Sequence, residues 1–200
     1  MSESKDDEHA QRMRKIKAEK DAEAKARTVK RGVVVVNTGD GKGKSSSAFG
    51  VAIRALGHGQ KVAIVQFIKG TWKTGERQFF SRLPEVTHIV SGEGFTWDTQ
   101  DRQRDIAAAE HGFDEARRLI ETGEHDVVIL DEINIATSYD YLDPEVLAEV
   151  LRNKPEHVSV ILTGRKAAQA VIDVADTVTE MKPIKHAHQA GIRARKGVEF

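Results

Sequence analysis

The sequence predicts an α/β domain with a doubly wound, mostly parallel sheet, preceded by a flexible or helical N-terminal extension. After Arg31, short apolar runs rich in β-branched residues alternate with longer amphipathic segments. Strands that are apolar almost throughout are typical of parallel sheets covered by helices on both faces. Regular alternation of strand and helix is the pattern of α/β domains, and we find no internal repeat.

Six strands are expected, and one amphipathic helix follows each of the first five. The strand runs are short and rich in the β-branched residues that strands favour. In chain order they are VVVV (within 32–37), VAIV (61–67), HIV (88–91), VVIL (127–131), VSVIL (158–163) and TVTEM (177–181). The helices are expected at 45–58, 75–82, 102–122, 144–153 and 166–174.

Length and composition indicate one domain, or one domain with a tail. The chain has 200 residues, of which 39% are apolar, enough for a single ordinary core. It contains no cysteine, which excludes disulfides, thiolate metal ligands and a cysteine nucleophile. The longest apolar runs, such as 33–36 and 127–130, are far shorter than the roughly 20 residues of a membrane span. Because MSESKDDEHA also lacks the apolar stretch of a secretory signal, we expect a cytoplasmic protein with no membrane contact.

The N-terminal extension, residues 1–30, differs in composition from the domain expected over residues 31–200. Residues 1–31 hold 10 of the 31 Lys/Arg and 7 of the 31 Asp/Glu, leaving 21 and 24 for the remainder. Its Ala, Lys, Glu and Arg residues are good helix formers, yet it has almost no apolar bulk. It can be a solvated tail, or a segment that covers an active site or a neighbouring subunit. The mixed charges argue against a nucleic-acid partner.

A glycine-rich turn follows the first strand and precedes the first helix. The segment reads VVVVNTGDGKGKSSSAFG, so Gly39, Gly41 and Gly43 allow backbone N–H groups to converge on an anion. Lys44 is placed to reach a phosphate, and Ser45 is placed to ligate Mg²⁺. The phosphate-loop pattern is G-x-x-x-x-G-K-[ST], and only its first glycine is missing, replaced by Thr38.

A carboxylate pair ends the fourth strand. Asp131 and Glu132 follow VVIL, where phosphate-loop proteins place the acid that holds Mg²⁺ or its water. Helix capping explains many such pairs, but the glycine-rich turn favours a metal site, with either acid as the ligand. The two segments together predict a domain of the phosphate-loop NTPase (RecA-like) kind. The guanine-specific N-K-x-D motif is absent, which favours ATP.

Further segments resemble the ATP:corrinoid adenosyltransferases of the cob(I)alamin and cob(I)yrinic acid a,c-diamide type. These are TGDGKGKSSSAFG with RALGHG, then GEGFTW and DEINIA, and finally TGR…ADTVTEM…KHA…AG…GVEF; together they span about residues 30–200. Ser45 and Ser46 stand where the family usually has threonines, which keeps the hydroxyl. Asp40 stands where many relatives have asparagine, which adds negative charge beside the triphosphate.

The resemblance implies a reaction and its participants. A Co(I) corrinoid attacks the 5′ carbon of ATP, forms a Co–C bond and releases triphosphate, with Mg²⁺ or Mn²⁺ as cofactor. In this family the nucleotide lies reversed in the loop compared with ordinary phosphate-loop ATPases. The replacement of the first glycine by Thr38 is compatible with that reversed orientation. Lys42, Lys44, Mg²⁺ and backbone donors would neutralise the leaving group. A homodimer and an electron donor, such as a reduced flavoprotein, are also implied, and the N-terminal segment is able to cover an active site.

Two aromatic residues in GEGFTW are candidates for the lower face of the corrinoid. Because a lower axial ligand makes reduction of Co(II) to Co(I) harder, apolar side chains there would favour Co(I). By resemblance these are Phe95 and Trp97, whose i, i+2 spacing puts both on one face of an extended segment. Without the motif, they would be interpreted as ordinary core aromatics.

Other polar residues are weaker candidates for the same site. Asn37 is either a ribose contact or a plain turn residue, and Arg54 either reaches nucleotide or forms a surface ion pair. Gln66 lies at the end of the second strand and Arg165 just after the fifth, both at the ligand-binding rim, where Arg165 would contact phosphate or corrinoid amides. For the histidines of KHAHQAG, we favour a structural or substrate-side role, since Mg²⁺ prefers oxygen.

The main alternative function is an ordinary phosphate-loop ATPase or kinase that cleaves the γ-phosphate. A non-catalytic carrier of corrinoid or nucleotide is a further one. The preferred corrinoid, the choice between biosynthesis and salvage of adenosylcobalamin, and the reductant are left open by the sequence.

Overall fold

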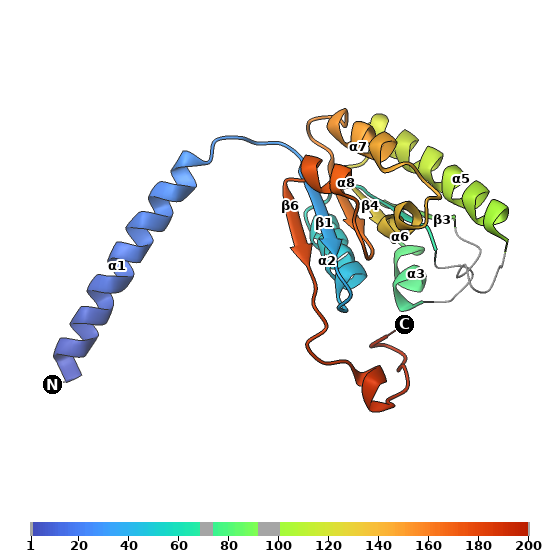
Figure 1. The fold of residues 1–200 in the computed structure, drawn as a ribbon. Coiled ribbons are helices and arrows are strands. Elements are labelled where there is room, and N and C mark those ends of the chain that lie inside the picture. The colour runs from blue at the N-terminus through green and yellow to red at the C-terminus, as the bar shows by residue number, and fades with distance from the viewer. Residues whose placement is uncertain (1, 69–73, 92–100, 200) are drawn as a thin grey trace. The chain divides into compact units, whose positions relative to one another are not determined.

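The computed structural model of the chain describes residues 2–68, 74–91 and 101–199 and comprises two compact units, Met1–Lys30 and Arg31–Phe200 (Figure 1). The second unit contains the sheet and the segments that form the candidate site. The first consists mainly of one helix, α1 (Ser2–Ala26).

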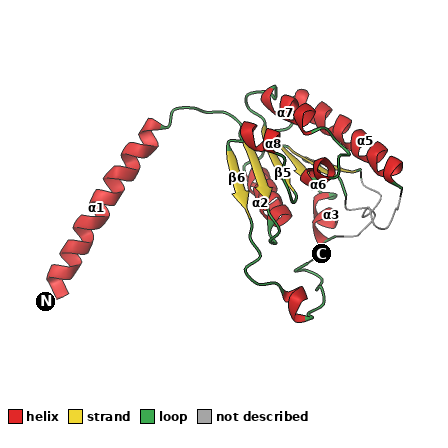
Figure 2. Cartoon of the chain, viewed as in Figure 1, coloured by secondary structure: helices red, strands yellow, loops and turns green. Residues whose placement is uncertain are grey.

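Six strands form one parallel sheet within the described residues (Figure 2). The strand order is β3-β2-β4-β5-β1-β6, and every neighbouring pair is parallel, as the apolar runs predict. All carboxyl ends therefore lie at one edge of the sheet, where α/β domains bind ligands. The strands are β1 (Val34–Thr38), β2 (Val62–Gln66), β3 (Val86–Val90), β4 (Val127–Asp131), β5 (Ser159–Thr163) and β6 (Thr177–Glu180).

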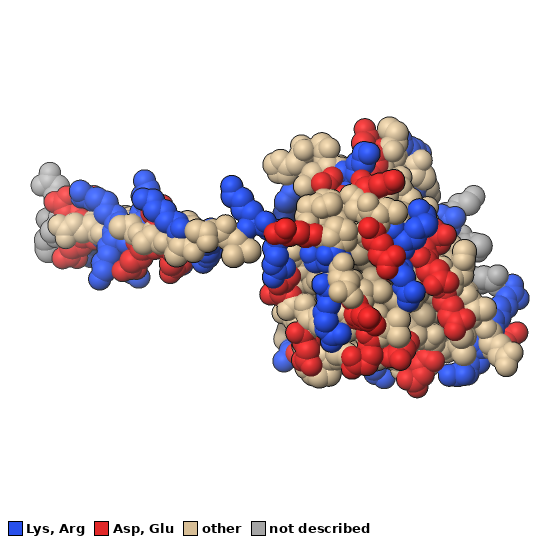
Figure 3. All heavy atoms as spheres, turned by 90° about the horizontal axis from the view of Figure 1, so that it is seen from above, with Lys and Arg blue, Asp and Glu red and all other residues tan. Residues whose placement is uncertain are grey.

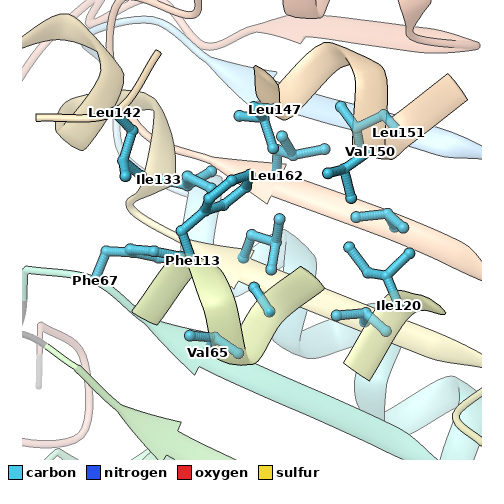
Figure 4. Close-up of a cluster of buried hydrophobic side chains, with 14 of the residues drawn as sticks. Val65, Phe67, Phe113, Ile120, Ile133, Leu142, Leu147, Val150, Leu151 and Leu162 are labelled. Carbon is cyan, nitrogen blue, oxygen red and sulfur yellow. The ribbon is translucent and has the colours of Figure 1, made fainter. Parts of the chain in front are cut away.

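Helices pack on both faces of the sheet, and alternate strand residues decide which face each side chain enters. On one face, Ile64 and Ile129 pack with Phe49 of α2 (Lys44–Gly57) and Phe80 of α3 (Gly75–Phe80). On the other face, Val65 and its neighbours pack against four further helices (Figure 4). These are α5 (Arg102–Glu121), α6 (Ile133–Ser138), α7 (Pro144–Arg152) and α8 (Gln169–Val174).

Two helical segments and one exposed strand differ from the sequence-based expectation. The short helix α6 and the 3₁₀ turn η1 (Ala187–Ala190) were not predicted. Helix α6 has only six residues, several of them β-branched, and burial of Ile133 and Ala136 compensates for its weak propensity. Strand β6 is present as predicted at one edge of the sheet, but all four of its residues are exposed, whereas those of β3 at the other edge are half-buried.

The described side chains of helix α1 include charged residues along its length and form no apolar face. Positive and negative side chains are interspersed along it (Figure 3), and its described side chains are exposed apart from the half-buried Ala10. Glu23 pairs with Lys20 at 3.0 Å and Arg27 at 3.7 Å, which supports the helix only weakly. Among the described residues, no helix combines the length and apolar character needed to cross a membrane.

The carboxylate of Asp176 joins the start of β1 to the start of β6. It accepts a hydrogen bond of 2.8 Å from Val34 N and two from the Arg31 guanidinium. The bonds from Arg31 and Val34 hold the pKa of Asp176 below its ordinary value, against a smaller opposing effect of burial. Since the folded state favours the ionised form, this carboxylate stabilises the fold above the ordinary aspartate pKa.

We predict that Asp176→Asn lowers the melting temperature by a few degrees at pH 7, because it weakens this junction. Ionisation contributes fully above the unfolded pKa of about 3.9 and is lost as the pH falls through the lower folded pKa. The gap between wild type and D176N in thermal melts should therefore narrow below about pH 4. Asp173→Asn, at an exposed carboxylate of α8, is the control; a gap that stays constant down to pH 2 would contradict the prediction.

Candidate active site

The glycine-rich turn lies between β1 and α2 and packs closely against the backbone that leaves β6. Met181 N donates to Thr38 O at 2.8 Å, and Gly41 N donates to Met181 O at 2.7 Å. A Cβ on Gly39 or Gly41 would lie 2.5 or 2.7 Å from Met181 O, and Gly39 has a φ of +94°. These two glycines are therefore required for the turn to lie against Met181.

The N-terminus of α2 points its backbone donors into this turn. Its N-cap is Gly43, with no capping side chain, and its first turn contains no acidic residue. Lys44 is only 8% exposed, and its Nζ donates to Gly41 O at 2.6 Å. Burial lowers the pKa of Lys44, and the negative charge of Glu132 acts in the opposite direction. A helix N-terminus with a buried ammonium beside it is suited to bind a polyanion.

A fully buried carboxylate, that of Asp131, ends β4 at the same edge of the sheet. Gln66 Nε2 donates to its Oδ2 at 2.9 Å, and Thr163 Oγ1 donates to its Oδ1 at 2.7 Å. Gln66 is 3% exposed and Thr163 is fully buried. Donors on both neighbouring strands thus compensate for the loss of water around the carboxylate.

Two further hydrogen bonds extend this arrangement. Glu132 N donates to Thr163 Oγ1 at 2.9 Å, and Glu132 adopts a left-handed conformation with φ of 65° before α6 begins. His88 Nε2 and Gln66 Oε1 are 2.9 Å apart. Burial lowers the pKa of His88, helped by the positive charge of Arg77 and opposed by Asp131, so the ring is neutral at pH 7.

Charged side chains of the C-terminal segment lie beside the turn. Arg165 lies 3.6 Å from Asp40, and Lys42 pairs with Glu199. These four residues line a cavity of about 490 Å³ together with His186 and His188. His186 Nδ1 accepts a hydrogen bond of 3.1 Å from His188 N, so it caps η1.

The predicted site residues that the structure describes differ in how far they lie from the turn. Asn37 is buried at the end of β1, while Ser45 is half-buried and Ser46 exposed in the first turn of α2. Arg54 is exposed in the last turn of α2, ten residues and hence about 15 Å along the helix from Lys44. Its assignment to nucleotide stays a prediction. Phe95 and Trp97 lie outside the described residues.

Several residues of the site were not identified as such in the sequence. Thr163 and Gln66 were recognised at strand ends, but not as the partners of Asp131. His88 was expected only as a strand residue, and Met181 and Glu199 only as parts of the C-terminal motif. A polar residue inside an apolar strand, as His88 is in VTHIV, was the available signal.

The oxygen donors present fit a magnesium ion that is held mainly by a bound nucleotide. Among the described residues, no three His, Asp or Glu side chains gather in a way that could hold a metal. Mg²⁺ commonly takes only one or two protein oxygens and completes its octahedron with phosphates and water. Ser45 follows Lys44 in the first turn of α2, and Glu132 is close enough to influence the pKa of Lys44. The donor set therefore suits a metal–triphosphate complex better than a free ion.

Residues 30–200 match the family described as ATP:corrinoid adenosyltransferase BtuR/CobO/CobP. A corrinoid adenosyltransferase of Pseudomonas aeruginosa is 51% identical over 200 residues, covering 100% of this chain and 98% of that protein. Proteins with the same description from Sinorhizobium sp. and Escherichia coli are 46% and 42% identical, covering 100% and 98% of this chain and 94% and 99% of theirs. The chain therefore belongs to the ATP:corrinoid adenosyltransferase family and is an enzyme of the transferase class.

Proposed function

We propose that the enzyme transfers the 5′-deoxyadenosyl group of ATP to the Co(I) centre of a corrinoid. The 5′ C–O bond of ATP breaks, a Co–C bond forms with the electron pair of Co(I), and triphosphate leaves. The observation that carries this proposal is the donor-lined turn with Lys44, lying at the same sheet edge as Asp131 and Glu132. Such a site neutralises a departing polyphosphate, while Co(I) is a strong nucleophile that needs no general base.

The main task of the site is to neutralise the negative charge that develops on the leaving triphosphate. Lys44 is held within the turn by Gly41 O, so its ammonium is already oriented before nucleotide binds. Lys42 is more exposed and would exchange Glu199 for a phosphate. Donors that are fixed beforehand stabilise a transition state without reorganisation. When bound, magnesium would add positive charge at the phosphate oxygens.

We assign the metal-facing carboxylate to Glu132 and a supporting role to Asp131. Asp131 is fully buried, and each of its oxygens already accepts a hydrogen bond. A metal at Asp131 would have to share an oxygen that already accepts one of these bonds, at a side chain with no exposed surface. Glu132 is partly exposed and lies near Lys44, so it and Ser45 are the residues that would hold magnesium.

The corrinoid side of the reaction is assigned to the segment after β3. This segment contains Phe95 and Trp97. We propose that their side chains pack against the lower face of the corrinoid and exclude water from cobalt. Arg165, exposed beside Asp40, is available to corrinoid amides or phosphate. The reaction also needs an electron donor, such as a reduced flavoprotein, and we place the enzyme in the cytoplasm as a homodimer.

An anaerobic assay with ATP, Mg²⁺ and chemically reduced corrinoids tests the proposal. We expect the Co(I) absorbance to fall as adenosylcorrinoid forms, with one intact triphosphate released per Co–C bond. ADP and inorganic phosphate as the products, formed without corrinoid, would instead indicate an ordinary phosphate-loop ATPase.

We predict that Lys44→Ala lowers kcat/KM for ATP by roughly 100-fold, because a preorganised cation at the leaving group is lost. The measurement is steady-state adenosylation with prereduced corrinoid at varied ATP. Lys42→Ala, at the more exposed lysine, serves for comparison and should cost less. A K44A enzyme within threefold of wild type would exclude a role for Lys44 at the leaving group.

We predict that a double variant, Phe95→Ala with Trp97→Ala, reduces turnover from Co(II) more than turnover from prereduced Co(I). Loss of apolar cover would let a lower ligand reach cobalt and make its reduction harder. Paired assays from the two starting states measure the difference, and equal losses would argue against action at the lower face.

We predict that deletion of residues 1–29 leaves the fold of Arg31–Phe200 intact and impairs corrinoid handling. The described side chains of α1 supply no buried apolar group, so the thermal melt should change little. The KM for corrinoid, measured with and without the extension, tests its proposed role as a cover of the active site. Unchanged kinetics would rule that role out.

A further inference from the structure

A row of side-chain hydrogen bonds crosses four adjacent strands near the carboxyl edge of the sheet. His88 lies on β3, Gln66 on β2, Asp131 on β4 and Thr163 on β5, which is the order of these strands in the sheet. Each bonds its neighbour, at 2.9, 2.9 and 2.7 Å. Strand register and the period of two place all four on the face covered by α2.

The donors and acceptors in this row have one consistent direction. An ionised carboxylate only accepts, so Gln66 must present its NH₂ to Asp131 and its carbonyl oxygen to His88. The His88 ring must then carry its proton on Nε2. From the other side, the Thr163 hydroxyl gives its single proton to Asp131 and accepts from Glu132 N. Two chains of donors therefore converge on Asp131.

Beyond Thr163, one further hydrogen bond connects the row to Glu132, the residue that we assign to the metal. The bond from Glu132 N to Thr163 Oγ1 holds the left-handed backbone from which the Glu132 side chain projects. The same Thr163 hydroxyl accepts from Glu132 N and donates its proton to Asp131. The backbone of Glu132 is thus linked to His88, on the edge strand β3, through Thr163, Asp131 and Gln66 in turn.

We propose that His88 is a positioning residue for the ATP–metal site, acting through Gln66 and Asp131. The inference rests on the proposed roles of Lys44 and Glu132 at the triphosphate. His88 fixes the Gln66 amide, which holds Asp131 between its two donors and keeps the turn at Glu132 in place. Loss of the His88 N–H would leave the Gln66 carbonyl without this donor and loosen the row from its outer end.

Calorimetric titration of the full-length protein with ATP and Mg²⁺, without corrinoid, tests this inference. His88→Leu removes the donor, whereas His88→Gln places an amide N–H close to the position of Nε2. Thr87→Val is the matched control, since Thr87 is the adjacent residue on β3 and bonds His125 Nε2 at 2.9 Å. His88→Asn, whose amide is one methylene shorter, replaces H88L if that variant does not fold.

We expect H88L to raise the Kd for ATP–Mg²⁺ about fivefold, the usual effect of losing one neutral hydrogen bond. H88Q and T87V should stay within about twofold of wild type, and the KM for corrinoid should not change in H88L. An H88L variant that binds ATP–Mg²⁺ as tightly as the wild type would overturn the inference. So would a Kd raised as much in H88Q or T87V as in H88L, because that result would indicate an effect of strand packing. If the wild type itself fails to bind ATP–Mg²⁺, the proposed function fails as well.

Discussion

A buried carboxylate constrains the carboxyl edge of this sheet. Moving an ionised Asp131 out of water costs on the order of several kcal/mol unless donors replace the lost solvent. Gln66 from β2 and Thr163 from β5 supply them, so both strands must keep their register with β4. A shift of one residue would turn either donor to the other face. The same register places Thr163 where it also bonds the backbone N of Glu132, the N-cap residue of α6.

The phosphate turn and the carboxylate pair perform separate parts of one task. The turn follows β1, which is next to β5, and the carboxylates follow β4 on the far side of β5. This spacing leaves Lys44 and Glu132 near each other, with burial and the carboxylate acting in opposite directions on the lysine. In the proposed reaction these charges act on the leaving triphosphate, while the nucleophile is supplied by the corrinoid. The protein therefore provides position and charge, and no general base.

Sequence periodicity predicted the parallel sheet and most of the helices, because apolar β-branched runs admit few other structures. The glycine-rich turn was likewise predictable, since Gly39 to Ser45 follow a chemical pattern within a few residues. The partners of Asp131 were not, because hydrogen bonds among His88, Gln66 and Thr163 depend on the strand order, which is not local information. Helix α6 was missed because tertiary burial of Ile133, and not propensity, sustains it. Arg54, Phe95 and Trp97 remain assignments from pattern or resemblance.

The most direct test of this account is a crystal structure with ATP and Mn²⁺ bound, in which anomalous scattering locates the metal. Because the proposed reaction needs Co(I) as its nucleophile, we expect ATP to stay intact in this complex when corrinoid is absent. We expect the triphosphate to bind the backbone donors of residues 39–45 and manganese to lie beside Ser45 and Glu132. Asp131 should still accept its hydrogen bonds from Gln66 and Thr163. Manganese bound directly to Asp131 with Gln66 displaced, or a triphosphate outside the glycine-rich turn, would contradict it.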